Sequence, residues 1–102
     1  MMDELLKELA PVVASETQRA SEQYGDKYAS AHEAESVLRE EIEELAEESI
    51  QTQIELTSMQ KTLHKQHTLE NYLQVKFYAL NAAAEAVQVA AVCEKIARGF
   101  EK

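Results

Sequence analysis

The spacing of apolar residues predicts a helix near the start of the chain. Apolar positions recur there at close to helical spacing, at Leu5, Leu6, Leu9, Val12, Val13, Ala20 and Tyr24. They predict a first helix from about Asp3 to Tyr24, in which Pro11 either causes a kink or begins a fresh first turn. The stretch GDKYAS at 25–30 then breaks the pattern.

A second, longer helix is expected to begin at Ser30, because Ser30 and Glu33 have the S-x-x-E spacing of a capping box. Its expected inner face follows alternating steps of three and four residues, at Leu38, Ile42, Leu45, Ser49, Thr52, Leu56, Met59 and Leu63. The helix is therefore predicted to continue to about His64, with a polar patch in the middle of this face.

A third long helix completes the predicted fold. The segment HKQHT at 64–68 is the expected turn, and the last helix should extend from about Thr68 to Arg98 and be closed by Gly99. The chain has only two glycines and one proline, and no stretch shows the alternation of a strand. We therefore expect a single all-α domain over residues 1–102. Three helices cannot cover every apolar face, so this long-helix bundle is expected to be a homo-oligomer.

Composition narrows the classes of function. The net charge is −9, and residues 1–50 carry 14 acidic against 4 basic side chains. Binding to a nucleic acid polymer needs clustered Lys and Arg, so it is not expected. No apolar run is long enough to span a membrane and no secretory leader is evident, which predicts a cytoplasmic protein. The single cysteine, Cys93, excludes a disulfide and is expected to be a buried, inert thiol.

The glutamates between 40 and 48 fall into two rows when each residue is rotated by about 100° along a helix. Glu40, Glu43 and Glu47 lie opposite the leucine-rich face and are expected to be solvated. The second row borders that face and consists of Glu41, Glu44 and Glu48. Carboxylates at this spacing can converge on one cation, although solvated acidic helices show the same spacing. The pattern alone leaves both interpretations open.

The last helix carries a further unusual carboxylate. From Ala82 to Cys93 every residue is apolar except Glu85 and Gln88. A helix that is apolar nearly all round is expected to be buried, and a buried ionised carboxylate needs a compensating charge. That charge is either a Lys or Arg of a neighbouring element or a metal ion between two acidic rows. Oxygen-rich sites of the second kind suit Mg²⁺.

These motifs resemble those of the MazG-like all-α nucleotide pyrophosphohydrolases. EEIEE at 40–44 matches the E-E-x-x-E pattern of that superfamily, and EAVQ at 85–88 stands where the family has E-x-x-D. The segments YGDKYASAHEAESVLREEIEEL and EAVQVAAVCEK are similar to the small phage and bacterial branch. The resemblance implies a helical dimer or tetramer that hydrolyses a nucleoside triphosphate to the monophosphate and pyrophosphate with Mg²⁺, or with Mn²⁺ in its place.

By position, the resemblance assigns Glu41, Glu44 and Glu85 as catalytic metal ligands, with Glu48 as a further ligand. Gln88 replaces the family's last Asp, so it would offer a neutral oxygen and one negative charge fewer, which weakens catalysis. Lys95 lies on the same predicted face as Glu85 and is either a phosphate-binding cation or a solvated side chain. The alternative function is a non-catalytic helical-bundle or coiled-coil interaction protein whose acidic rows provide solubility and register.

Overall fold

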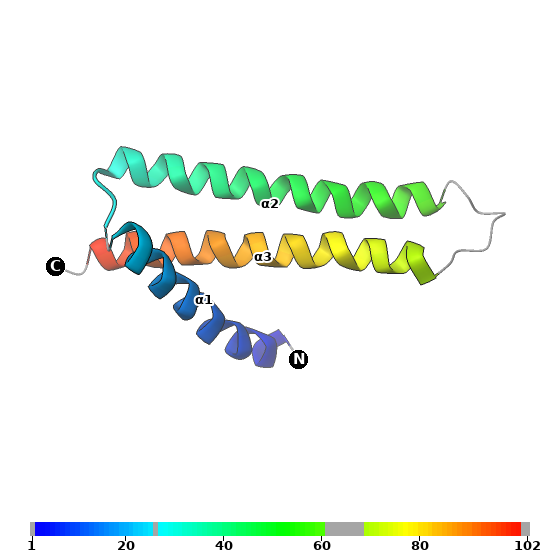
Figure 1. Ribbon diagram of the computed structural model, residues 1–102, viewed down its shortest axis with the longest axis horizontal. Coiled ribbons are helices and arrows are strands. Elements are labelled where there is room, and N and C mark those ends of the chain that lie inside the picture. The colour runs from blue at the N-terminus through cyan, green and yellow to red at the C-terminus, as the bar shows by residue number, and fades with distance from the viewer. Residues whose placement is uncertain (1, 26, 61–68, 101–102) are drawn as a thin grey trace.

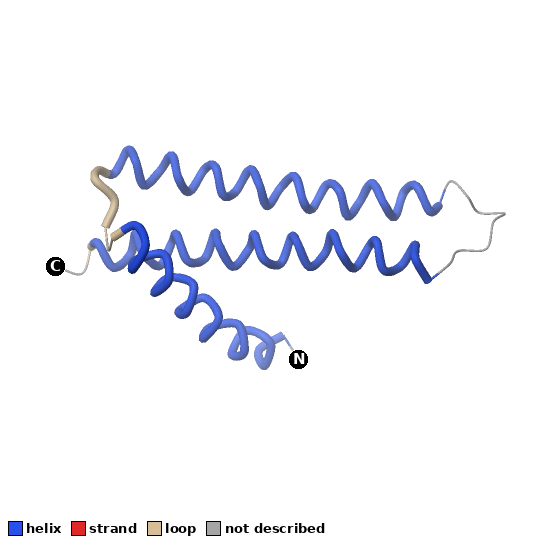
Figure 2. The backbone as a smooth tube through the Cα atoms, viewed as in Figure 1, coloured by secondary structure: helices blue, strands red, loops and turns tan. Residues whose placement is uncertain are grey.

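The computed structural model of the protein describes residues 2–25, 27–60 and 69–100. These residues form three helices, α1 (Met2–Tyr24), α2 (Ala31–Gln60) and α3 (Leu69–Gly99). Helices α2 and α3 lie side by side and antiparallel, and α1 crosses the C-terminal half of α3 at an angle (Figure 1). Figure 2 shows that the described chain is helical apart from the short loop between α1 and α2. The predicted all-α bundle is confirmed.

Helix α1 continues through Pro11 without a break in the helix. It ends at Gly25, which has a φ of 92°, and the Gly25 N–H donates to the carbonyl of Ser21 at 2.8 Å. Glycine tolerates this left-handed conformation because it has no Cβ, so Gly25 is the C-terminal cap of α1. Gly99 was expected to close α3, and α3 does end at this residue. Gly99 does not have a positive φ, and Phe100 N–H donates to the carbonyl of Ala97 at 3.0 Å.

The predicted capping box is present at the start of α2. Ser30 Oγ accepts a hydrogen bond from the Glu33 N–H at 3.1 Å, and the Ser30 carbonyl accepts one from the Ala34 N–H. The Glu33 carboxylate reaches back to the N–H of Ala29, one residue before the expected partner. These bonds satisfy N–H groups that a helix terminus leaves unpaired. The predicted extension of α2 to His64 and the turn at 64–68 lie outside the described residues.

The face of α2 that packs against α3 differs from the predicted one at every second position. Its buried and half-buried residues are Ala34, Leu38, Glu41, Leu45, Glu48, Thr52, Glu55 and Met59. Ile42, Ser49 and Leu56 were expected on this face but are exposed. Helix α2 carries apolar residues on two adjacent stripes, and α3 covers only the stripe that contains the glutamates. This register brings carboxylates into the helix interface.

Helix α1 packs against α3 through a small, partly polar contact. Thr17 is the most buried side chain described, and its Oγ1 lies 2.8 Å from both the Val13 carbonyl and Glu94 Oε2. The other helix, α2, makes no contact with α1. One side of α3 therefore stays uncovered, and Cys93 is exposed there, so its expected burial is wrong.

Large apolar side chains remain exposed on all three helices. They include Leu5, Leu6 and Val12 on α1, Ile42, Ile50 and Ile54 on α2, and Leu73, Phe77 and Leu80 on α3. None of the helices in the described ranges combines the length and apolar character that a membrane span requires. The exposed faces agree with the expectation that three helices are too few to cover the apolar residues of this chain.

Candidate metal centre

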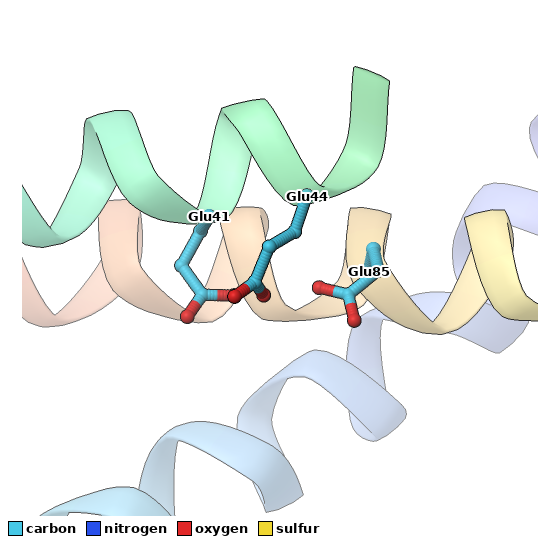
Figure 3. A group of neighbouring side chains, drawn as sticks. All are labelled: Glu41, Glu44 and Glu85. Atoms are coloured by element: carbon cyan, nitrogen blue, oxygen red, sulfur yellow. The ribbon is translucent and has the colours of Figure 1, made fainter. Parts of the chain in front are cut away.

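Three carboxylates meet where the middle of α2 packs against α3. Glu41 and Glu44 come from α2 and Glu85 comes from α3, and each offers an oxygen that lies within 4.8 Å of the other two. Figure 3 shows Glu41 and Glu44 extending from α2 and Glu85 from α3, with the three carboxylate groups close together. The structure thus brings together the first acidic motif and the Glu of the last helix, which are more than forty residues apart in the sequence.

Helix geometry explains why these residues converge. Leu38 and Leu45 anchor α2 on α3, and Glu41 lies between them on the same face. Glu44 follows three residues later, so its side chain is one helical turn further on and beside Glu41. Glu85 lies on the half-buried face of α3 that packs against this part of α2.

The electrostatics of the cluster favour a bound positive charge. Burial is the main cause of a raised pKa at Glu85, followed by the charge of Glu44, a hydrogen bond with Glu44, and the charges of Glu41 and Glu48. Burial and then the charges of Glu44 and Glu40 raise the pKa of Glu41. Like charges and desolvation both disfavour the ionised form. Either protons or a cation can relieve this repulsion.

Two carboxylate oxygens of the interface lack any hydrogen-bond donor. Within the described chain, Glu48 Oε2 and Glu85 Oε2 are buried side-chain atoms without a partner. Leaving such an atom unpaired costs about 1–3 kcal/mol, and more when it is charged. Glu48 lies on the interface face of α2, two helical turns after Glu41, so its charge reaches Glu85. An oxygen-ligated divalent cation could occupy this group of oxygens, because Mg²⁺ and Ca²⁺ both prefer carboxylates.

The other row of glutamates is separate from the cluster. Glu40, Glu43 and Glu47 are exposed, as the helical rotation predicted. They share the middle of α2 with Glu41 and Glu44 but point away from α3. They therefore provide matched controls, because they carry the same charge on the same helix.

Gln88 faces α1 rather than the three carboxylates. Its Nε2 donates to Glu16 Oε1 at 2.6 Å, and Glu16 is also paired with Arg19. Hydrogen bonds from Arg19 and then Gln88 lower the pKa of Glu16 to about 2, against a smaller opposing effect of burial. Sequence reasoning missed Glu16, because no motif indicates which face of α1 meets α3.

Lys95 lies apart from the cluster, near the C-terminal end of α3. Ten residues separate it from Glu85, which corresponds to about 15 Å along a helix. It is buried, with Nζ 4.1 Å from the centroid of the Tyr28 ring. The solvated alternative for Lys95 is therefore wrong, and within the described residues its ammonium group packs on Tyr28 without forming an ion pair with Glu41, Glu44 or Glu85.

Comparisons with known proteins add no assignment. No protein-family model, no curated protein and no solved structure matches the chain.

Proposed function

We propose that the protein is a Mg²⁺-dependent nucleoside triphosphate pyrophosphohydrolase that releases a nucleoside monophosphate and pyrophosphate. The observation that carries this proposal is the meeting of Glu41, Glu44 and Glu85 across α2 and α3. Their sequence motifs resemble those of MazG-like enzymes, and the helices bring the two motifs to one place. On this proposal the protein acts in the cytoplasm on a small nucleotide, not on a nucleic acid polymer.

Each carboxylate has a role in this proposal. Glu41, Glu44 and Glu85 bind the cation, and Glu48 supplies a further oxygen from the next turns of α2. The unpaired Oε2 atoms of Glu48 and Glu85 support these roles, since a cation would give them a partner. A bound Mg²⁺ neutralises the triphosphate and lowers the pKa of a water molecule that attacks phosphorus. Mn²⁺ has the same preference for oxygen ligands and is expected to substitute for it.

Gln88 modifies the proposed site rather than completing it. The Gln88 amide donates to Glu16 of α1, and the Glu16 carboxylate is already paired with Arg19. The cluster therefore has one carboxylate fewer than the family motif implies. We propose that Mg²⁺ binds weakly on its own and more tightly together with the triphosphate, which brings its own negative oxygens.

Self-assembly is part of the same proposal. Helix α1 diverges from α3 toward its N-terminus, and between them is a hollow of about 530 Å³ whose lining includes Leu6, Leu9, Ala83 and Ala86. The small alanines allow another helix to approach closely. We propose a homodimer or homotetramer in which the exposed apolar stripes of one subunit cover those of another.

A second function, a non-catalytic helical interaction protein, is favoured by one observation. Ile50 and Ile54, one helical turn apart, form a short exposed apolar stripe on α2 that needs no metal and no catalysis to bind a partner helix. The glutamates of the interface distinguish the two functions, because a purely structural bundle gains nothing from unpaired carboxylate oxygens between its helices.

A hydrolysis assay tests the proposal. A panel of nucleoside and deoxynucleoside triphosphates is incubated with the protein and Mg²⁺, and pyrophosphate and monophosphate are both measured. At least one nucleotide should yield the two products in equal amounts, and Glu44→Gln should reduce the rate by about 100-fold or more while Glu43→Gln leaves it unchanged. Equal rates in the two variants, or no turnover of any nucleotide, would rule out the proposed role of the cluster.

A further inference from the structure

A second pocket lies at the end of the α2–α3 pair where α2 begins and α3 ends. It has a volume of about 440 Å³ and is bounded by the α1–α2 loop, the first turns of α2 and the end of α3. Its charged lining residues are Lys27, Lys95 and Glu35. Two lysines in one pocket are notable in a chain whose net charge is −9.

Lys95 is the main reason to regard this pocket as a binding site. Its side chain lines the pocket, yet the residue is only 6% exposed. Within the described ranges Lys95 belongs to no ion pair, and its Nζ lies over the face of the Tyr28 ring at 4.1 Å. An aromatic face attracts a cation, but it compensates a buried ammonium group only in part. The ammonium group therefore lacks an anion.

The N-terminus of α2 opens on the same pocket. Ser30 and Ala31 line it, and they begin a helix of 30 residues. The capping bonds satisfy the N–H groups of Glu33 and Ala34, but among the described residues the N–H groups of Ala31 and His32 have no acceptor. Free N–H groups and the helix dipole favour a negative group at this position, above all phosphate. The helix N-terminus is a feature independent of Lys95, and both features favour a negatively charged ligand.

The remaining walls of the pocket are apolar. Ala34 and Leu38 come from α2, and Ile96 and Phe100 come from the end of α3. Phe100 is largely exposed and Leu38 is half-buried, so an apolar ligand would remove both from water. An inorganic anion would contact only the charged side of the pocket, whereas an organic anion would also pack against the apolar walls.

We propose that the pocket between Tyr28, Lys95 and the N-terminus of α2 binds a small organic phosphate, with the phosphate at the two lysines and an aromatic or aliphatic body against Leu38, Ile96 and Phe100. Binding requires no metal ion. Glu35 also lines the pocket, where its carboxylate is already paired with Arg39 at 3.0 Å. The proposal does not rest on nucleotide hydrolysis at the carboxylate cluster.

Isothermal titration in EDTA tests the pocket with three probes: phenyl phosphate, inorganic phosphate and neutral benzyl alcohol. Phenyl phosphate should bind saturably and more tightly than either of the others. Lys95→Met should weaken this binding by about tenfold or more, because a charge-assisted contact is lost. Lys76→Met is the matched control, since Lys76 is an exposed residue of α3 that does not line the pocket. Its affinity should equal that of the native protein.

Lys27→Met gives a second test that avoids the buried position. Lys27 is exposed and lines the pocket, so its replacement should lower the affinity for phenyl phosphate without unfolding the protein. If Lys95→Met does not fold, this variant decides the outcome. Absence of saturable binding, equal affinity in the lysine variants and the native protein, or equal affinity for phenyl phosphate and benzyl alcohol would each overturn the proposal. Glu85→Gln should retain full binding, which separates this site from the carboxylate cluster.

Discussion

Glu44 of α2 and Glu85 of α3 meet across the helix interface, where each carboxylate offers an oxygen within 4.8 Å of the other. Burial and then the charge of Glu44 are the largest causes of the raised pKa of Glu85. The interface therefore stores a repulsion that either a proton or a cation relieves.

The pH dependence of stability follows from this raised pKa. A carboxyl group whose pKa is higher in the folded state binds its proton more tightly there, so it stabilises the fold below its ordinary pKa and loses that contribution as pH rises. In the absence of metal, Glu85→Gln should therefore raise stability at pH 7 by about 1–3 kcal/mol and have little effect at pH 4. Urea unfolding at the two pH values measures this. A loss of stability at pH 7 would contradict the account.

Glu16 should behave in the opposite way. Its pKa is lowered to about 2, so its carboxylate stabilises the fold above the ordinary pKa of 4.5 and loses this contribution as pH falls. Glu16→Gln should cost about 1–2 kcal/mol at pH 7, allowing for solvent screening, and much less at pH 3. Chemical denaturation at both pH values provides the test. Glu8→Gln is the control, because Glu8 is an exposed residue of the same helix.

Gln88→Asp tests the family motif against the contact that the structure contains. The new carboxylate would lose the amide bond to Glu16 and face that anion instead. The metal-free variant should be about 1–2 kcal/mol less stable than the native protein, and Glu16→Gln in the same chain should recover most of the loss. Thermal unfolding of the single and double variants measures the coupling. Additive effects would show that the two side chains do not interact.

The exposed stripe of α2 predicts self-association. The protein should be a dimer or tetramer by light scattering at micromolar concentration, and Ile54→Glu should shift it toward monomer, because a charge then has to be buried in the contact. Gln53→Glu places the same charge on the neighbouring exposed residue and should have a smaller effect. A native protein that is monomeric by light scattering would contradict the proposed self-association.

Periodicity predicted the helices and their caps well, because local patterns determine them. Ser30 and Glu33 lie three positions apart within one turn, and their spacing alone located the start of α2. The inner face of α2 was harder to predict, since Glu41 and Ile42 differ by only a quarter of a turn and both neighbour leucines. Which of the two residues faces inward depends on how α3 packs against α2. That packing is determined by contacts between residues that are far apart in the sequence.

The same limit applies to the side chains around the site. The sequence grouped Glu41, Glu44 and Glu85 through their motifs, and the structure brings them together. It could not place Glu16 beside Gln88 or Tyr28 beside Lys95, because each pair joins α3 to an element whose orientation no motif specifies. Lys95 and Glu85 were predicted to share a face of the last helix. Two residues on one face can still lie far apart along the helix axis, as these two do.

Titration of Mg²⁺ into the metal-free protein, with heat as the readout, tests the central claim most directly. The native protein should bind the ion at a single class of site, and Mg²⁺ should raise its melting temperature, because the ion binds only the folded state. Glu44→Gln and Glu85→Gln should each weaken binding by about tenfold or more, whereas Glu43→Gln should bind like the native protein. Equal binding by all three variants, or no binding by the native protein with or without a nucleoside triphosphate, would contradict the assignment of Glu41, Glu44 and Glu85 as a metal centre.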